Sequence, residues 1–336
     1  MKNNFDVIII GSGVGGLSAA CWAKKIGLSF IVIEWNKDLI LNLKNGVHYL
    51  HNKPELPFDP DLKTITLTDG ILKENGFIQP LPSLNDALEY SEKVREIQHP
   101  SSIFEVGQRK EVYITQNNSL DDLLLQMYEY SGKENFLFSS QLIGIDVENK
   151  NIEINTFEDK IKLNYKNILL TIPLPKLIEL TNSEKSIDSF YSNPIKIINC
   201  KVNNIVPNWL INLYIPSPKE KIYRMSILNN LMSSESVDEL DSNDILHLKE
   251  LFKMFYIDIS NPTKYEWKQG KIISISIDYR KKILEQFIKN DIYTIGRFGL
   301  WNSKLLVDST INQAKICIDC ITENIGKKEL TKKLTL

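Results

Sequence analysis

The stretch DVIIIGSGVGGLSAACWAKKIGLSFIVIE, residues 6–34, constrains the fold more than any other part of the chain. Val7 to Ile10 is a continuous β-branched run, typical of a strand buried on both faces of a parallel sheet. Apolar residues then recur at helical spacing from Leu17, and Gly27 stands where a helix C-cap is expected. A second apolar run spans Phe30 to Ile33. The pattern predicts a strand, a helix and a second, parallel strand.

Glycines and one acid occupy defined positions in this unit. Gly11, Gly13 and Gly16 form GxGxxG directly after the first strand, and Glu34 ends the second strand, 23 positions after Gly11. The three glycines would allow a tight turn, close approach of a pyrophosphate and close helix packing, and the helix N-terminus would offer N–H groups to phosphates. Glu34 would accept hydrogen bonds from a ribose diol. The pattern predicts a dinucleotide site that also includes Ser12, Val14, Gly15 and Trp35.

Three further stretches bear on the choice between FAD and NAD. They are NGVHYLH at 45–51, NILLTIPLPKLIEL at 167–180, and DIYTIGRFGLWNSKLLVDSTINQAKICI at 291–318. With the N-terminal unit, they resemble the FAD-dependent amine oxidase superfamily, which includes protoporphyrinogen oxidase-like proteins and UDP-galactopyranose mutase. In that family these stretches are a Gly-x-His segment at the cofactor, a strand ending in a proline-containing turn, and the C-terminal flavin motif.

The resemblance implies FAD as the cofactor and names the residues around it. Gly46, Val47 and His48 would meet the flavin, and the backbone of Leu142 would touch the adenine. Gly296 and Arg297 would lie beside the cofactor, and Asp308 near the ribityl chain and the flavin edge. Two departures from the family pattern concern FAD contacts. Only 13 residues separate Glu34 from His48, where many relatives carry a longer pyrophosphate-gripping segment, and Asn312 and Gln313 stand where a small residue is common.

Three residues are candidates for catalysis, each with a structural alternative. The resemblance implies that Lys196 holds a water near flavin N5, although in a strand it could equally face outward. Arg224, in KIYRMSILNN, would meet an anionic substrate group or the flavin face, or would be a solvated strand arginine. His48 would handle a proton beside the flavin, or would be a hydrogen-bonded structural residue.

The expected fold class is α/β, with a Rossmann-like FAD-binding domain of the GR2 type and an inserted α+β substrate domain. We expect a discontinuous FAD-binding domain from residues 1–59, 111–181 and 291–336, and a substrate domain from residues 60–110 and 182–290. There is no second GxGxxG to indicate an internal NAD(P)H domain.

Three functions follow as hypotheses. The first is an FAD-dependent oxidoreductase of the amine oxidase type, which oxidises a small amine or a C–C or C–N bond by hydride transfer to flavin N5. The second is a mutase-like isomerase that uses reduced flavin without net redox change. The third is a non-catalytic dinucleotide-binding protein. The sequence does not identify the substrate, the electron acceptor or the oligomeric state.

Composition argues against several other classes. A formal net charge of −2 over 336 residues gives no general reason to expect nucleic acid as a partner. No apolar run approaches the roughly 20 residues that span a bilayer, and no secretory signal pattern opens the chain, so we expect a cytoplasmic protein with a small-molecule substrate and no membrane insertion. Only four histidines are present, and the spacing of His48 and His51 would point them to opposite faces of extended chain, so we expect no metal site. The CxxC of Cys317 and Cys320 is either a redox pair or, on an apolar helix face, core filling.

Overall fold

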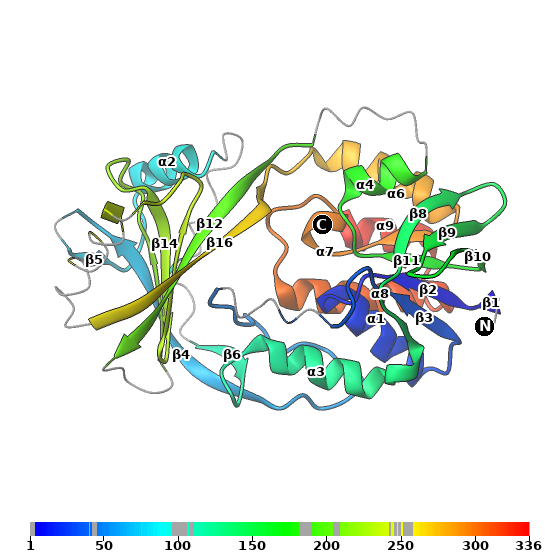
Figure 1. The fold of residues 1–336 in the computed structure, drawn as a ribbon. Coiled ribbons are helices and arrows are strands. Elements are labelled where there is room, and N and C mark those ends of the chain that lie inside the picture. The colour runs from blue at the N-terminus through cyan, green and yellow to red at the C-terminus, as the bar shows by residue number, and fades with distance from the viewer. Residues whose placement is uncertain are drawn as a thin grey trace.

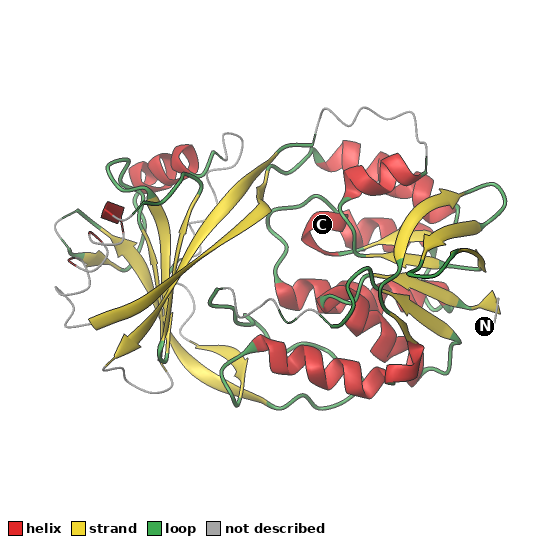
Figure 2. Cartoon of the chain, viewed as in Figure 1, coloured by secondary structure: helices red, strands yellow, loops and turns green. Residues whose placement is uncertain are grey.

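The computed structural model describes residues 4–39, 41, 46–74, 76–95, 106–107, 111–181, 190–203, 209–241, 243–244, 247, 250 and 258–335. Its strands form three sheets, and most of the helices lie around the five-stranded one (Figure 2). Figure 1 shows a large twisted sheet beside a parallel sheet, with both chain ends on the parallel-sheet side. Strands β12 and β16 run from the large sheet towards helices α4 and α6. The stretch SLNDALEYSEKVREIQ, residues 83–98, has helical spacing, and the structure describes a helix over Leu84–Lys93. Residues 96–98 lie outside the described part.

The parallel sheet contains the predicted N-terminal unit. Its order is β17-β11-β2-β3-β7, and every neighbouring pair is parallel. All residues of this sheet's first two strands along the chain, Val7–Ile10 and Phe30–Ile33, are buried, as expected for a sheet covered on both faces. The strands are β2 (Val7–Ile10), β3 (Phe30–Ile33), β7 (Phe136–Leu137), β11 (Ile168–Leu170) and β17 (Ile292–Thr294).

Helices and a small antiparallel sheet enclose the parallel sheet. One face packs into a core with α1 (Val14–Lys25), α8 (Val307–Ile321) and α9 (Lys327–Thr335). The other face packs with α4 (Leu174–Leu180) and the sheet β1-β10-β9-β8. Helix α6 (Ile277–Lys289) contributes to both cores. The small sheet consists of β1 (Asn4–Phe5), β8 (Gln141–Asp146), β9 (Asn151–Asn155) and β10 (Lys160–Tyr165).

The large sheet is mostly antiparallel, with the order β16-β12-β15-β14-β13-β4-β5, and β6 pairs with β4. Helix α2 (Leu84–Lys93) packs on it, and α3 (Leu120–Ser131) leads from β6 towards the parallel sheet, followed by η1 (Lys133–Asn135) (Figure 1). The strands are β4 (Leu62–Leu72), β5 (Ile78–Gln79), β6 (Glu111–Thr115), β12 (Ser192–Asn203), β13 (Trp209–Tyr214), β14 (Ile222–Leu228), β15 (Leu231–Ser236) and β16 (Asp258–Ile272).

The two faces of the large sheet differ in chemistry. Side chains alternate along each strand, so one face presents Leu213, Ile227 and Met232, which share an apolar core and define the outer face. The opposite, inner face presents Leu210 and Leu228, which pack with the segment around Val47 and with α1 and α3. The inner face therefore meets the part of the molecule that carries the glycine-rich unit.

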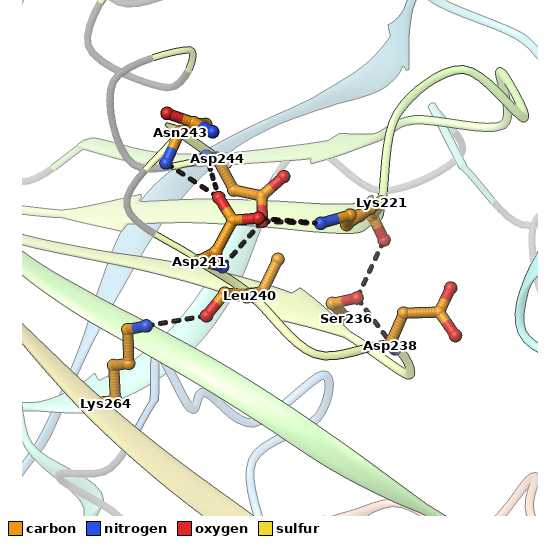
Figure 3. A network of polar contacts seen from close by, with 8 residues as sticks. All are labelled: Lys221, Ser236, Asp238, Leu240, Asp241, Asn243, Asp244 and Lys264. Carbon is orange, nitrogen blue, oxygen red and sulfur yellow. Dashed lines mark hydrogen bonds and ion pairs between the residues drawn. The ribbon is translucent and has the colours of Figure 1, made fainter.

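A polar network fastens the chain after β15 to the large sheet (Figure 3). The Lys221 ammonium lies 2.9 Å from Asp244 Oδ2, which also accepts a hydrogen bond from the backbone N–H of Asp241. Ser236 donates to the Lys221 carbonyl, and Lys264 of β16 donates to the Leu240 carbonyl at 2.6 Å. These groups partner one another, so we read the network as structural.

The expected α/β fold with a Rossmann-like unit and an added sheet is confirmed. The division into residue ranges stays a prediction. Helix α6, expected on the substrate side, packs against β17 and α9, and β6, expected on the cofactor side, pairs with β4 of the large sheet. Within the described residues, no helix combines the length and the apolar character that crossing a bilayer requires.

Candidate functional site

The glycine-rich turn after β2 leaves the N-terminus of α1 open. Gly13 is the N-cap, and neither a side-chain cap nor an acidic first-turn residue is present. A Cβ built on Gly13 would meet no protein atom within 4 Å. The first N–H groups of a helix need partners, and phosphate oxygens are suitable ones. This end of α1 therefore fits a diphosphate that approaches Gly13.

The other glycines of the turn serve packing. A Cβ on Gly16 would lie 1.9 Å from the Gly11 carbonyl oxygen, so only glycine fits there. Gly11 has φ +95° and faces Thr171, which follows β11. A Cβ on Gly15 would lie 3.1 Å from Thr310 Cγ2 on α8. The turn is thus held between segments far apart in the chain.

Glu34 is buried at the end of β3 and is bound by its own chain. Its Oε2 accepts hydrogen bonds from the backbone N–H and the hydroxyl of Ser12, both at 2.8 Å. Its Oε1 accepts from the backbone N–H of Asn36 at 3.0 Å and from that side chain at 2.5 Å. A ribose diol would compete with Asn36 for Oε1. Trp35 points outward, with 68% of its surface exposed.

The C-terminal motif reaches the same region. Gly296, with φ +82°, begins the short helix α7 (Gly296–Gly299), and a Cβ there would lie 3.2 Å from Thr310 Cγ2. The Gly296 N–H donates to Gln313 Oε1 at 2.9 Å, so the unusual glutamine holds this turn. Arg297 donates through Nε to the Leu305 carbonyl.

Asp308, in the first turn of α8, is buried and linked to a distant loop. Its Oδ2 accepts from the backbone N–H of Asn52 at 3.0 Å and from the Asn52 side chain at 2.8 Å. This pair joins the segment after His48 to the helix that closes the expected cofactor site. The contact of Asp308 with a ribityl chain stays a prediction.

His48 lies between the cofactor side and the large sheet. Its ring stacks on Trp267 of β16, with centroids 5.7 Å apart and planes at 10°. Gly46 has φ +148°, and a Cβ there would lie 3.2 Å from His48 Nε2. Nε2 is buried and has no hydrogen-bond partner in the described part of the chain. Burial, aided by the positive charge of Arg224, lowers the pKa of His48 to about 4. The imidazole is therefore neutral at physiological pH.

Arg224 forms a partly buried ion pair on the inner face. A register shift between Ile222 and Arg224 lets two consecutive residues of β14 reach Glu235 of β15. Arg224 pairs with Glu235 Oε1, and the Tyr223 hydroxyl donates to Oε2 at 2.6 Å. Burial alone would lower the pKa of Arg224 and raise that of Glu235, but their mutual attraction reverses both shifts. The pair is charged and locally compensated.

Tyr49 follows His48 in the chain and contacts Asn212 of β13, which pairs with Ser226 of β14 on the inner face. Asn212 Nδ2 lies 3.4 Å from the Tyr49 hydroxyl, and Ser226 donates to Asn212 Oδ1 at 2.7 Å. Burial raises the pKa of Tyr49 above its ordinary value, so the hydroxyl stays protonated. The sequence contained Tyr49 in the Gly-x-His stretch but gave no signal for Glu235, Trp267 or Asn212, whose roles come from strand pairing.

The structure does not bring Lys196 to this cluster. Lys196 pairs in register with Ser236 and Glu266, on the outer face. Its ammonium lies 2.9 Å from Glu266 Oε1 and 2.7 Å from Glu239 Oε1. The lysine side chain is 17% exposed and the glutamates more so, so this is a surface ion-pair cluster. The position of Lys196 favours the alternative in which its side chain faces outward. Its predicted role of holding a water near flavin N5 stays a prediction that this position does not support.

Leu142 lies apart from the His48 cluster, in the small antiparallel sheet. Its side chain is buried in the core, and β8 is an edge strand with a register shift between Leu142 and Gly144. An edge strand has backbone groups outside the ladder, so the expected backbone contact with an adenine is geometrically open and stays a prediction.

The positions of the cysteines agree with the hypothesis that they fill the hydrophobic core. All four are free and buried, and burial raises the pKa of the Cys317 and Cys320 thiols. A redox pair needs accessible thiolate, so this setting favours the core alternative. The described residues contain no group of three or more His, Cys, Asp or Glu side chains that could hold a metal ion.

Comparison with known proteins adds a family match and structural neighbours. The family model of the FAD binding domain matches residues 6–40. Reduced UDP-galactopyranose mutase is 14% identical, with a TM-score of 0.70 over 97% of this chain and 96% of that one. A putative protoporphyrinogen oxidase from Exiguobacterium sp. 255-15 is 12% identical, with a TM-score of 0.61 over 97% and 100%. p-Nitrophenol 4-monooxygenase from Pseudomonas putida DLL-E4 is 12% identical, with a TM-score of 0.56 over 98% and 83%. No curated protein sequence matches.

These similarities show the fold that the sequence led us to expect. The chain shares its fold with UDP-galactopyranose mutase and a putative protoporphyrinogen oxidase, and its first strand–helix–strand unit matches the FAD binding domain model. The FAD binding domain match, the uncapped end of α1 and the open space at Gly13 support FAD as the cofactor. Mutase, oxidase and monooxygenase neighbours share this architecture, so the fold alone does not identify a reaction.

Proposed function

We propose that this chain, with its flavoprotein fold, is an FAD-dependent oxidoreductase that oxidises a small amine or a C–C or C–N bond. The observation that carries the proposal is the neutral imidazole of His48, held against the inner face of the large sheet with an unpartnered Nε2. When bound, FAD supplies an acceptor for the electron pair of a substrate bond.

The residues around His48 supply binding and orientation. A neutral imidazole can accept a hydrogen bond from a substrate N–H or O–H, which fixes the bond to be oxidised. Trp267 fixes the ring plane, and Gly46 leaves room beside Nε2. Arg224 lies close enough to His48 to disfavour its protonation. These residues hold one reactive orientation and keep the imidazole uncharged.

The test is anaerobic mixing of the FAD-loaded protein with a panel of small amines. We expect at least one amine to bleach the oxidised flavin absorption without added reductant. His48→Ala should slow the bleaching by about 100-fold, whereas His247→Ala, at an exposed histidine paired with Glu220, should leave it unchanged. Normal bleaching by His48→Ala would remove the role proposed for His48.

An isomerase that uses reduced flavin is the second candidate. It is favoured by the similarity to reduced UDP-galactopyranose mutase over nearly the full length of both chains. It predicts that no amine bleaches the flavin and that a nucleotide sugar is converted only after chemical reduction of the protein. A colourless protein that takes up no FAD would instead favour the third candidate, a binding protein without catalysis. A small-molecule substrate and a cytoplasmic location are further parts of the proposal, carried over from the sequence.

A further inference from the structure

A cavity of about 420 Å³ opens beside His48. This volume lies in the range of pockets that take small molecules. Two turns from distant parts of the chain form its polar side, one before α3 and one between β14 and β15. The polar lining residues are His48, Asn117, Asn118, Ser119, Asn229 and Asn230.

The cavity wall carries no charge at neutral pH. Its remaining side chains are apolar and come from Val47, Leu120, Leu228 and Leu231. His48 is neutral because burial lowers its pKa. An ion entering such a cavity would lose hydration without gaining an opposite charge. The wall therefore selects against both anionic and cationic groups.

Two lining side chains lack hydrogen-bond partners in the described part of the chain. They are His48, through Nε2, and Asn118, through Oδ1, and both atoms are buried. An amide oxygen accepts hydrogen bonds, and a neutral imidazole nitrogen can do so. Buried polar groups normally find partners, so the two atoms fit a ligand that donates hydrogen bonds.

The sheet beyond the cavity continues this uncharged surface. Leu228 and Leu231 pair across β14 and β15, and the next inner-face pair is Ser226 with Ser233. Ser233 is 2% exposed, and its hydroxyl has no partner among the described residues. One row further, the charge of Arg224 is compensated by Glu235. The inner face thus offers no free charge along this line.

We infer that this cavity binds the uncharged, hydrogen-bond-donating part of the substrate, a carboxamide or hydroxyl group on an apolar body. The inference rests on the proposed function, since it places the substrate next to His48. It narrows the substrate class: carboxylates, phosphates and permanently cationic amines are excluded from this cavity.

The experiment compares three probes of matched shape: benzamide, benzoate and benzamidinium. Binding to the FAD-loaded protein is measured by ligand-observed NMR, with the flavin absorption spectrum recorded on the same samples. We expect the dissociation constant of benzamide to be at least about tenfold lower than those of the two ions. Equal binding of all three, or tightest binding of an ion, would overturn the inference.

Variants of the lining residues test whether benzamide binds in this cavity. Leu231→Trp fills the apolar wall and should weaken benzamide binding at least about tenfold, whereas Leu125→Trp, at an exposed position on α3 outside the lining, should not. If Leu231→Trp fails to fold, Asn230→Asp is the substitute. It puts an anion in the lining at an exposed position and should reverse the preference towards benzamidinium. Unchanged benzamide binding in the folded variant tested would contradict the assignment.

Measuring benzamide binding with and without bound FAD distinguishes failure of this inference from failure of the proposed function. Benzamide that binds the protein without FAD but not the loaded protein would assign the cavity to the cofactor and overturn the inference. A protein that takes up no FAD and still binds benzamide in preference to the ions would reject the oxidoreductase and keep the cavity's specificity.

Discussion

At the residue scale, two glycines of the same motif have different surroundings, so we expect different effects when each is replaced. Gly16 is fixed by the Gly11 carbonyl, 1.9 Å from where a Cβ would stand, whereas Gly13 faces open space with φ −72°. Gly16→Ala should destabilise the protein by about 3 kcal/mol or more, because the helix must move off the strand. Gly13→Ala should change the free energy of unfolding by no more than about 0.5 kcal/mol.

The two alanine variants should also differ in cofactor binding. Gly13→Ala should fold normally yet weaken FAD at least about tenfold, because the methyl group enters the space expected for the pyrophosphate. Chemical denaturation and FAD titration of both variants provide the check. Normal FAD affinity in Gly13→Ala would mean that the pyrophosphate lies elsewhere.

His48 gives the protein a specific pH dependence. Its folded-state pKa of about 4 lies below the ordinary value of 6.5, so the unfolded chain binds more protons between these values. The His48 contribution to stability is complete above about pH 6.5 and is lost as the pH falls through about 4, on the order of 3 kcal/mol.

Denaturation curves of the wild type and His48→Gln between pH 7 and pH 4 isolate this contribution, because glutamine does not titrate. We expect the variant to lose less stability than the wild type over this range. His247→Gln, at an exposed position, should follow the wild type. Parallel curves for the wild type and His48→Gln would show that the imidazole is solvated.

At the scale of elements, the register shift in β14 decides what Arg224 can do. It turns Tyr223 and Arg224 towards one carboxylate, whereas strict alternation would send them to opposite faces. Arg224 is therefore not free to neutralise a substrate anion, as one of the sequence-based interpretations supposed, without giving up Glu235.

Removing the Glu235 carboxylate should show how strongly Glu235 and Arg224 stabilise each other. Glu235→Gln leaves the Arg224 charge without its partner and should cost about 2 kcal/mol or more of stability, less than for a fully buried pair because the arginine side chain is 29% exposed. The double variant Arg224→Gln, Glu235→Gln should be more stable than Glu235→Gln alone. Thermal denaturation of the three proteins tests this, and additive losses would argue against a coupled pair.

At the scale of the whole molecule, four separate segments meet at the expected cofactor site. The glycine turn touches Thr171 and Thr310, and Asn52 binds Asp308 across 256 positions of the chain. A ligand that contacts several of these segments binds the folded state only. FAD at 100 times its dissociation constant should therefore add about 2.7 kcal/mol of stability.

Calorimetry can follow this stabilisation. FAD should raise the Tm by roughly 5 °C under those conditions. ADP at the same concentration, which offers only the nucleotide half, should raise it less. Gly13→Ala should lose most of the FAD effect. An equal rise with ADP and FAD would indicate that the flavin half makes no contact with the protein.

The sequence by itself determined the N-terminal unit and the flavoprotein fold. Gly11, Gly13 and Gly16 act within one turn, and their roles follow from backbone sterics that no distant residue can change. The stretch around Gly296 could be matched for a similar reason, since its strand, turn and helix are contiguous. The FAD cofactor and the inserted domain were expected because several such stretches together resemble a known family.

Only the tertiary structure decided which side chains face one another. Glu235 meets Arg224 because of one shifted register, and Lys196 faces away because of its parity on β12. Trp267 meets His48 through β16, a strand more than 200 positions further along the chain. Strand register moves side chains between faces in steps of one residue. A pattern read along the chain carries no record of how distant strands align, so the chemistry of the site was settled by pairing.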